Sequence, residues 1–134
     1  MRTLKIVLVD DNEPFRKALK TLLVKEFNAN IIGEASSAEE FSKLTGFYNA
    51  NIILMDVMMP EVDGITLAKK ILWKFPHLKI IAITMHTDKV YLTSLIEAGF
   101  KGCIFKTNIF EDLNSAIDTV INGHLYFPKD IIIS

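Results

Sequence analysis

The stretch IILMDVMMP, residues 52–60, decides the fold: four apolar residues lead into one acid, and the run then breaks at a proline. A continuous apolar run of this length is typical of a strand buried on both faces of a parallel sheet. A buried carboxylate without a partner is costly. Asp56 must therefore be neutral, be paired with a cation, or sit where the strand emerges into a polar crevice.

Apolar runs of the same kind recur along the chain and alternate with segments whose apolar residues are spaced as on one face of a helix. The predicted strands are Leu4–Val9, Ile31–Ala35, Ile52–Met55, Ile80–Ile83 and Gly102–Phe105. The predicted helices run from the Asn12 cap through Leu23, from Ser36 or Ser37 to near Gly46, from the Asp63–Gly64 turn to Pro76, from about Asp88 to Ala98, and from about Ile109 to Asn122. Right-handed crossovers place such helices on both sides of a sheet. The sequence therefore predicts an α/β fold with a doubly wound, five-stranded parallel sheet.

The sequence also contains residues that predict where helices begin and end and which face of a helix is apolar. Asn12 and Pro14 are start signals for the first helix, and Gly99 is a good left-handed stop for the fourth. The predicted apolar face of the last helix consists of Phe110, Leu113, Ile117, Val120 and Ile121. The aromatic residues Trp73, Phe75 and Tyr91 can be interpreted as an interaction patch, but at helical positions in so apolar a chain we favour partial burial in the core.

Composition excludes several classes of protein. A chain of 134 residues that is half hydrophobic fits one domain with a substantial core. Lys and Arg total 15 against 16 for Asp and Glu, so we expect no direct nucleic-acid binding by this domain. The single cysteine, Cys103, excludes an internal disulfide and fits a reducing compartment. The first apolar run is too short for a signal peptide or a membrane span, so we expect a cytoplasmic protein without membrane attachment.

Polar residues follow the predicted strands at the edge where functional crevices of such folds lie. Asp10 and Asp11 follow the first strand, and Asp56 follows the third. Thr84 ends the fourth strand and Lys106 follows the fifth. Three carboxylates close together repel one another unless a positive charge lies between them. A divalent cation with oxygen ligands, Mg²⁺ or its substitute Mn²⁺, would resolve this, with the Lys106 ammonium beside it.

Each of these residues has an ordinary structural interpretation when it is taken alone. Asp10 or Asp11 could be a helix cap, Thr84 a simple strand residue, and Lys106 a solvated lysine. Their joint placement at strand ends of one predicted sheet favours a functional site.

With these motifs the chain resembles the response-regulator receiver domains of two-component signalling, whose fold is flavodoxin-like. The resemblance is carried by LKIVLVDDNEPFRKAL (4–19), IILMDVMMPEVDG (52–64), IIAITMH (80–86) and EAGFKGCIFK (97–106). It implies that Asp56 is the phosphoacceptor and that Asp11 and the Met58 backbone carbonyl bind Mg²⁺ with it, Asp10 acting through water. It further implies that Thr84 hydrogen-bonds the phosphoryl group and Lys106 pairs with it.

The chemistry implied by the resemblance is transfer from a phosphohistidine of a sensor histidine kinase. The Asp56 carboxylate attacks phosphorus, and positive charges neutralise the equatorial oxygens of a loose transition state. The domain is then a phosphoacceptor rather than an enzyme, although it catalyses its own phosphorylation and dephosphorylation. We expect Asp56 to be exposed to the reagent, with Pro60 and Gly64 turning the loop away.

One position departs from the family pattern. Receiver domains usually carry Tyr or Phe three residues before the lysine, a ring that turns inward as the Thr follows the phosphoryl group, and here that position is Cys103. We favour a small core-facing residue with the signal carried by loops and helices; altered switching is the alternative. A redox role is less favoured because no resolving cysteine exists.

The C-terminal sequence suggests how the domain acts. GHLYFP (123–128) resembles the junction in LuxR/FixJ-type regulators, which a helix-turn-helix DNA-binding domain follows. We therefore divide the chain into a receiver domain, 1–124, and the start of a linker, 125–134. Three isoleucines, 131–133, are expected to pack on a further part of the protein or to begin that linker.

The favoured hypothesis is a phosphorylation-dependent switch that controls a DNA-binding domain, with homodimerisation on phosphorylation. The alternatives within the family are a stand-alone receiver acting by protein docking or phosphorelay, and a phosphate-independent pseudo-receiver. From other classes, an aspartyl phosphatase would want a second acid where Met58 stands, and a nucleotide-binding module would need a glycine-rich loop after the first strand.

Overall fold

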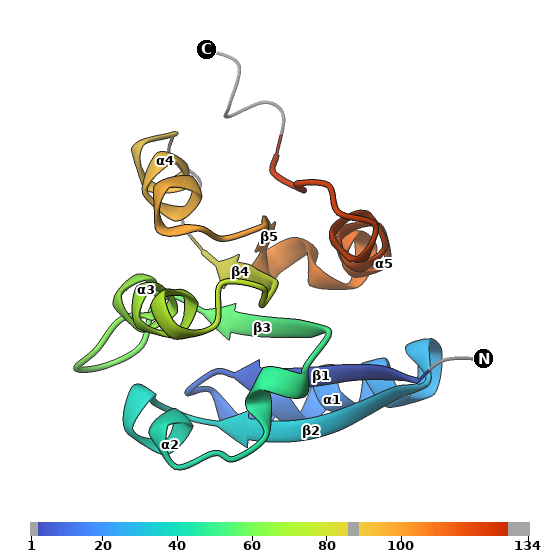
Figure 1. The fold of residues 1–134 in the computed structure, drawn as a ribbon. Coiled ribbons are helices and arrows are strands. Elements are labelled where there is room, and N and C mark those ends of the chain that lie inside the picture. The colour runs from blue at the N-terminus through green and yellow to red at the C-terminus, as the bar shows by residue number, and fades with distance from the viewer. Residues whose placement is uncertain (1–2, 86–88, 129–134) are drawn as a thin grey trace.

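A five-stranded, all-parallel sheet forms the centre of the described part of the chain (Figure 1). The structure is a computed structural model, and it describes residues 3–85 and 89–128. The strands are β1 Leu4–Val9, β2 Ala29–Ala35, β3 Ile52–Asp56, β4 Ile80–Thr84 and β5 Gly102–Phe105. They lie in the order β2-β1-β3-β4-β5. The predicted fold class is therefore confirmed.

Helices cover both faces of this sheet (Figure 1). They are α1 Glu13–Phe27, α2 Ala38–Ser42, α3 Gly64–Lys74, α4 Lys89–Ala98 and α5 Ile109–Ile121, with short 3-10 turns η1 Phe47–Asn49 and η2 Lys106–Asn108. One apolar cluster lies between the sheet and α2, α3 and α4, and a second lies between the sheet and α1 and α5. Because both faces are covered, nearly every residue of the three central strands is buried, as the continuous apolar runs indicated.

Side-chain caps explain where three helices begin. Asn12 accepts from the backbone N–H of Phe15 at the start of α1, as predicted. Ser37, rather than Ser36, caps α2 by accepting from the N–H of Glu40, whose carboxylate in turn accepts from the N–H of Ser36. This reciprocal pair is a capping arrangement that fixes the entry of α2. Gly99 follows α4 with φ +101°, the left-handed conformation expected of the residue predicted to end this helix.

Several element boundaries differ from the prediction, among them those of the second helix and of β2. The second helix ends at Ser42 instead of near Gly46, because Gly46 adopts φ +77° and begins the separate turn η1. Strand β2 begins at Ala29, two residues before the predicted start, since Ala29 and Asn30 pair with β1. The predicted first residue of the fourth helix, Asp88, lies outside the described residues.

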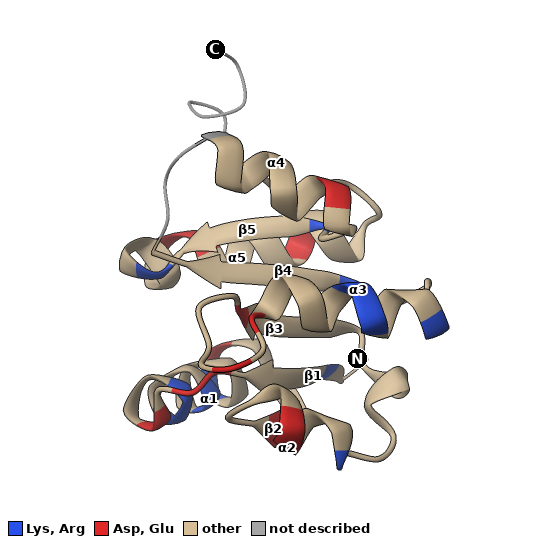
Figure 2. Cartoon of the chain, turned by 90° about the vertical axis from the view of Figure 1, so that its left-hand side faces the viewer, with Lys and Arg blue, Asp and Glu red and all other residues tan. Residues whose placement is uncertain are grey.

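Two aromatic side chains predicted to be at least partly buried are exposed instead. Phe110 is 66% exposed because the buried stripe of α5 begins at Ile109 and continues through Leu113 and Ile117. Trp73 is 87% exposed on the outer side of α3, among the lysines that appear blue on that helix in Figure 2. Phe75 and Tyr91 are partly buried against the first cluster, as expected. The three aromatic residues therefore do not form one patch.

The segment after α5 runs beside β5. Tyr126 forms an isolated parallel bridge with Gly102. Its N–H donates to the Lys101 carbonyl at 3.0 Å, and its carbonyl accepts from the Cys103 N–H at 2.8 Å. A Cβ atom at Gly102 would lie 3.0 Å from the Tyr126 carbonyl oxygen, so the absence of a side chain there permits this close approach.

Other expectations about the ends of the chain stay predictions. The isoleucines 131–133 lie outside the described residues, and the division into residues 1–124 and 125–134 is an expectation about a further domain. Within the described ranges, no helix combines the length and the apolar character that a membrane crossing needs.

Candidate functional site

The fold brings the predicted site residues to one edge of the sheet, beyond the carboxyl ends of the strands. Asp56 is the last residue of β3 and Thr84 the last of β4, while Lys106 follows β5 directly. Asp10 and Asp11 follow β1 in the adjacent loop. Figure 2 shows an acidic segment in red at the end of β3. The convergence of all five positions follows from the parallel arrangement of the strands.

The three aspartates are close enough together to bind one metal ion. Asp10, Asp11 and Asp56 each offer an oxygen atom, and these oxygens lie within 4.8 Å of one another. Asp10 and Asp56 are buried, whereas Asp11 is exposed. Such a set of carboxylate oxygens suits a hard divalent cation such as Mg²⁺.

Lys106 lies between the two buried carboxylates. Its Nζ atom is 3.2 Å from Asp10 Oδ2 and 3.6 Å from Asp56 Oδ2. The same ammonium lies 4.4 Å from the centroid of the Phe15 ring at the start of α1, a cation–π arrangement that shields it from water. The lysine is therefore a positioned charge rather than a solvated side chain.

Asp56 is more buried than the sequence suggested. Its exposed fraction is 4%, so the expectation of an exposed acid is wrong. The pKa of Asp56 is raised from 3.8 to about 6, chiefly by burial and also by the charges of Asp10 and Asp11, while the Met58 N–H and Lys106 act to lower it. The Met58 N–H donates to Asp56 Oδ1 at 2.9 Å. The hydrogen bond from Met58 and the nearby Lys106 ammonium thus partly offset the free-energy cost of placing this acid at the end of a buried strand.

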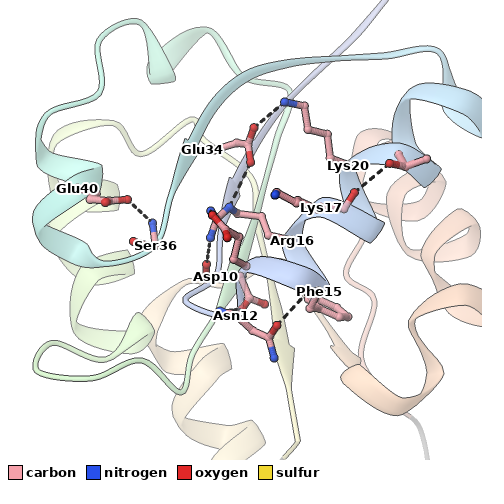
Figure 3. A network of polar contacts seen from close by, with 11 residues as sticks. Asp10, Asn12, Phe15, Arg16, Lys17, Lys20, Glu34, Ser36 and Glu40 are labelled. Atoms are coloured by element: carbon pink, nitrogen blue, oxygen red, sulfur yellow. Dashed lines mark hydrogen bonds and ion pairs between the residues drawn. The ribbon is translucent and has the colours of Figure 1, made fainter.

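One carboxylate oxygen of Asp10 is hydrogen-bonded, and the other can still accept a hydrogen bond or bind a cation. Its Oδ1 accepts from the Asn12 N–H at 2.8 Å, and its backbone carbonyl accepts from the Arg16 guanidinium at 2.5 Å (Figure 3). Its buried Oδ2 has no hydrogen-bond partner among the described residues, although Lys106 lies within ion-pair distance. A carboxylate oxygen in this state keeps lone pairs for a further donor or a cation. The donor set therefore fits the divalent metal that the sequence implied.

A second charged network supports the loop that carries Asp10. Arg16 Nε lies 3.1 Å from Glu34 Oε1, and Lys20 Nζ lies 2.7 Å from Glu34 Oε2 (Figure 3). Burial would raise the pKa of Glu34, but its bonds to Lys20 and Arg16 outweigh burial and the pKa is lowered. Arg16 therefore links α1, β2 and the backbone of Asp10. No role for Arg16 could be predicted, because its spacing from Lys20 on the helix identifies a polar face but not its acidic partner on β2.

Thr84 is fully buried and contacts a residue of α4. Tyr91 makes a side-chain hydrogen bond with Thr84, and its hydroxyl donates to the Met58 sulfur at 4.0 Å. Burial raises the pKa of Tyr91 to about 12, with smaller contributions from Asp63 and Asp56. The sequence indicated Tyr91 only as an aromatic residue of a helix, because nothing in its spacing reveals which strand end it meets.

Cys103 occupies the core. Its side chain is fully buried in the apolar cluster under α3 and α4, and burial raises the pKa of its thiol to about 12. A thiol with so high a pKa stays protonated and is a poor nucleophile. The structure therefore agrees with the favoured interpretation of Cys103 as a small core residue.

The sequence of this chain is similar to those of known response regulators. The sequence profile of the response regulator receiver domain matches residues 6–118. The transcriptional regulatory protein DegU of Brevibacillus brevis is 29% identical over 127 residues, which cover 94% of this chain and 54% of that protein. The response regulator UvrY of Escherichia coli K12 is 30% identical over 128 residues, which cover 96% of this chain and 59% of that protein. The chain thus spans less than two thirds of the length of these curated relatives.

Solved structures agree with the sequence comparison. A LuxR-family two-component response regulator from Aurantimonas sp. SI85-9A1 superposes with a TM-score of 0.88 at 27% identity, covering 97% of this chain and 93% of that one. The isolated receiver domain of RcsB from Salmonella enterica serovar Typhimurium, solved with the phosphomimetic BeF₃⁻, gives a TM-score of 0.81 at 25% identity, covering 97% of this chain and 96% of that one. Both likenesses extend over nearly the whole chain.

Proposed function

This chain belongs to the response regulator receiver domain family, and on that premise we propose that it is a signalling switch in which Asp56 accepts a phosphoryl group from a sensor histidine kinase. The observation that carries the proposal is the Lys106 ammonium, 3.6 Å from Asp56 Oδ2 at the end of β3. An acid with a partly buried positive charge beside it is suited to receive a group that brings negative charge. With its pKa raised to about 6, Asp56 is still mostly ionised at neutral pH and able to act as a nucleophile.

In the proposed reaction an Asp56 oxygen forms a bond to phosphorus while the bond from phosphorus to the kinase histidine nitrogen breaks. Lys106 neutralises charge on the transferred group, and the Thr84 hydroxyl donates a hydrogen bond to one of its oxygens. Asp11, Asp56 and the Met58 backbone carbonyl would hold Mg²⁺ or Mn²⁺, with Asp10 acting through water. The metal would supply further neutralisation of the equatorial oxygens. We propose that the domain is a phosphoacceptor and not a multiple-turnover enzyme.

For the output we propose control of a helix-turn-helix DNA-binding domain in the full-length protein, with homodimerisation on phosphorylation. The curated relatives are named as transcriptional and response regulators and are longer than this chain, which supports the proposal. A cytoplasmic location fits a kinase-driven switch of this kind.

The test is intact mass spectrometry after incubation with Mg²⁺ and acetyl phosphate, beside Asp56→Asn. The matched control is Asp118→Asn, which changes an exposed aspartate of α5 away from the site. We expect one phosphoryl mass on the parent protein and on Asp118→Asn, dependent on Mg²⁺, and none on Asp56→Asn. An unmodified parent protein that remains folded would refute phosphorylation by small donors.

A further inference from the structure

The outer side of α3 carries a basic surface with an exposed tryptophan at its centre. This α3 surface is a shallow hollow lined by Lys69, Lys70, Trp73 and Lys74. The helix begins at Gly64, whose N–H donates to the Val57 carbonyl, and ends shortly before β4. The α3 surface therefore lies at the end of the sheet opposite to Asp56, where Figure 2 shows the lysines of α3 in blue.

All charges on α3 have the same sign. Its sequence, GITLAKKILWK, contains three lysines and no acid, whereas the whole chain has a net charge of −1. Lys70 and Lys74 are one turn apart, a spacing at which like charges destabilise a helix. Within residues 3–85 and 89–128 none of the three lysines forms an ion pair, in contrast to Lys20, which is paired with Glu34. An anionic partner would remove this repulsion.

Trp73 adds a large apolar side chain to these charges. It is 87% exposed, and Lys69 and Lys70 lie four and three residues before it, on the same side of the helix. In the described part of the chain no aromatic ring or cation contacts the indole; the cation–π contact there joins Lys106 and Phe15. Solubility and the helix dipole explain lysines at the end of a helix, but not an exposed indole. Tryptophan is enriched among the residues that dominate binding energy.

The surroundings of the α3 surface limit the kind of partner. Glu61 and Asp63 are exposed just before α3, so a long phosphate backbone that followed the helix would meet acids, whereas a short acidic segment would not. A helix that lies on a membrane needs a wide apolar face. Leu67 and Ile71 are buried in the core, which leaves Trp73 as the exposed large apolar side chain of this helix.

We propose that the α3 surface binds a short acidic segment of another protein, with an apolar side chain of that segment packed on Trp73 and its carboxylates facing Lys69 and Lys70. The proposal rests on charge complementarity and is independent of the phosphorylation of Asp56. A contact made by one anchor and a few cations on one helix is of the weak, transient and salt-sensitive kind.

Trp73 is the single tryptophan of the chain, so its fluorescence reports on this surface alone. The probe is a synthetic peptide of about twelve residues, glutamates around one leucine and one phenylalanine, which is long enough to cover two turns of α3. We expect it to shift Trp73 emission to shorter wavelength and to reduce quenching by acrylamide. The apparent Kd should rise at least about fivefold between about 0.02 M and about 0.3 M NaCl. The same peptide with lysine in place of glutamate should have no effect.

A pair of substitutions tests the lysines. Lys69→Gln combined with Lys70→Gln removes two charges and keeps helix propensity, and we expect it to raise the Kd at least about fivefold. The matched control, Lys17→Gln combined with Lys25→Gln, removes two exposed charges of α1 and should keep the parent Kd.

The anchor is tested by the anisotropy of a fluorescein-labelled form of the acidic peptide, which does not depend on tryptophan. Trp73→Ala should raise the Kd at least about tenfold. Phe110→Ala, which removes another exposed aromatic side chain on α5, should leave the Kd unchanged.

Several results would overturn the inference. One is a folded parent protein whose emission the acidic peptide does not shift, and another is an equal Kd for the parent and the Lys69→Gln, Lys70→Gln variant. An emission shift on raising the protein concentration alone would identify a second copy as the occupant, through its acidic helix α5. Tighter binding of a short DNA duplex, or of vesicles of phosphatidylserine and phosphatidylcholine, than of the peptide would identify a different class of partner.

Discussion

The Lys106 ammonium lies 3.6 Å from Asp56 Oδ2, although the two residues close different strands, β5 and β3, with β4 between them. The contact depends on the parallel order of three strands and not on any local sequence. The positive charge that the proposed phosphoryl transfer requires is therefore already beside Asp56 in the unmodified protein.

Replacement of Lys106 should therefore weaken phosphoryl transfer more than it weakens the fold. Lys106→Met keeps much of the alkyl stem and removes the charge that faces Asp10 and Asp56. We expect the rate of mass gain with acetyl phosphate to fall at least about tenfold, which corresponds to about 1.4 kcal/mol in the barrier. Lys74→Met, on the exposed end of α3, should react at the parent rate. Equal rates for both variants would contradict the assigned role of Lys106.

The raised pKa of Asp56 predicts a cost in stability at neutral pH. With a folded pKa of about 6 against an ordinary value of 3.8, the folded protein binds this proton more tightly than the unfolded chain does. Ionised Asp56 therefore destabilises the fold above pH 6, and the penalty disappears as the pH falls toward 4. Urea unfolding without divalent metal should find Asp56→Asn more stable than the parent by about 1–3 kcal/mol at pH 7.5. A difference that grew on acidification would have the wrong sign.

Mg²⁺ should stabilise the protein through the aspartates. A cation that binds only the folded state stabilises it by RT ln(1 + [L]/Kd), so the melting temperature rises with the Mg²⁺ concentration. The increase should be lost in Asp11→Asn, which removes the exposed member of the cluster, and kept in Asp118→Asn. Because a protonated carboxylate is a poor ligand, the increase should also shrink as the pH falls through about 6. Thermal melts with MgCl₂ and with EDTA measure both effects, and an equal increase in Asp11→Asn would exclude this cluster as the site.

Arg16 should contribute more to the free energy of unfolding than Lys20, which lies one turn later on α1. Its side chain is 12% exposed and bonds both Glu34 and the Asp10 carbonyl. Arg16→Ala should cost about 1–2 kcal/mol of unfolding free energy, because it leaves a carbonyl without its donor. Lys20→Ala removes a more exposed ion pair and should cost less than about 1 kcal/mol. Urea denaturation distinguishes the two, and similar losses would show that the ion pairs to Glu34 carry the whole effect.

Much of the fold could be predicted because its strands are buried on both faces. Runs such as Ile52–Met55 have no other simple explanation in an α/β chain, and parallel strands bring their following residues together without further information. For that reason the clustering of Asp10, Asp56 and Lys106 could be expected from the sequence.

The features that could not be predicted depend on the rotation and position of the helices against the sheet. The exposure of Phe110 and Trp73 is decided by the rotation of α5 and α3 against the sheet, and spacing alone fixes that only to within part of a turn. The burial of Asp56 and the contact of Tyr91 with Thr84 depend on the neighbouring loop and on the position of α4. The chemical roles of the site residues stay predictions until phosphorylation is measured.

The pairing of Tyr126 with β5 has a consequence for solubility. An edge strand with unsatisfied backbone groups is a template on which another chain can add a strand and begin to aggregate. The Cys103 N–H of β5 and the carbonyl of Lys101, the residue before this strand, are both bonded by Tyr126, so the chain blocks its own template at this edge. A substitution that displaces Tyr126, such as Gly102→Val, would expose these groups and favour intermolecular strand addition.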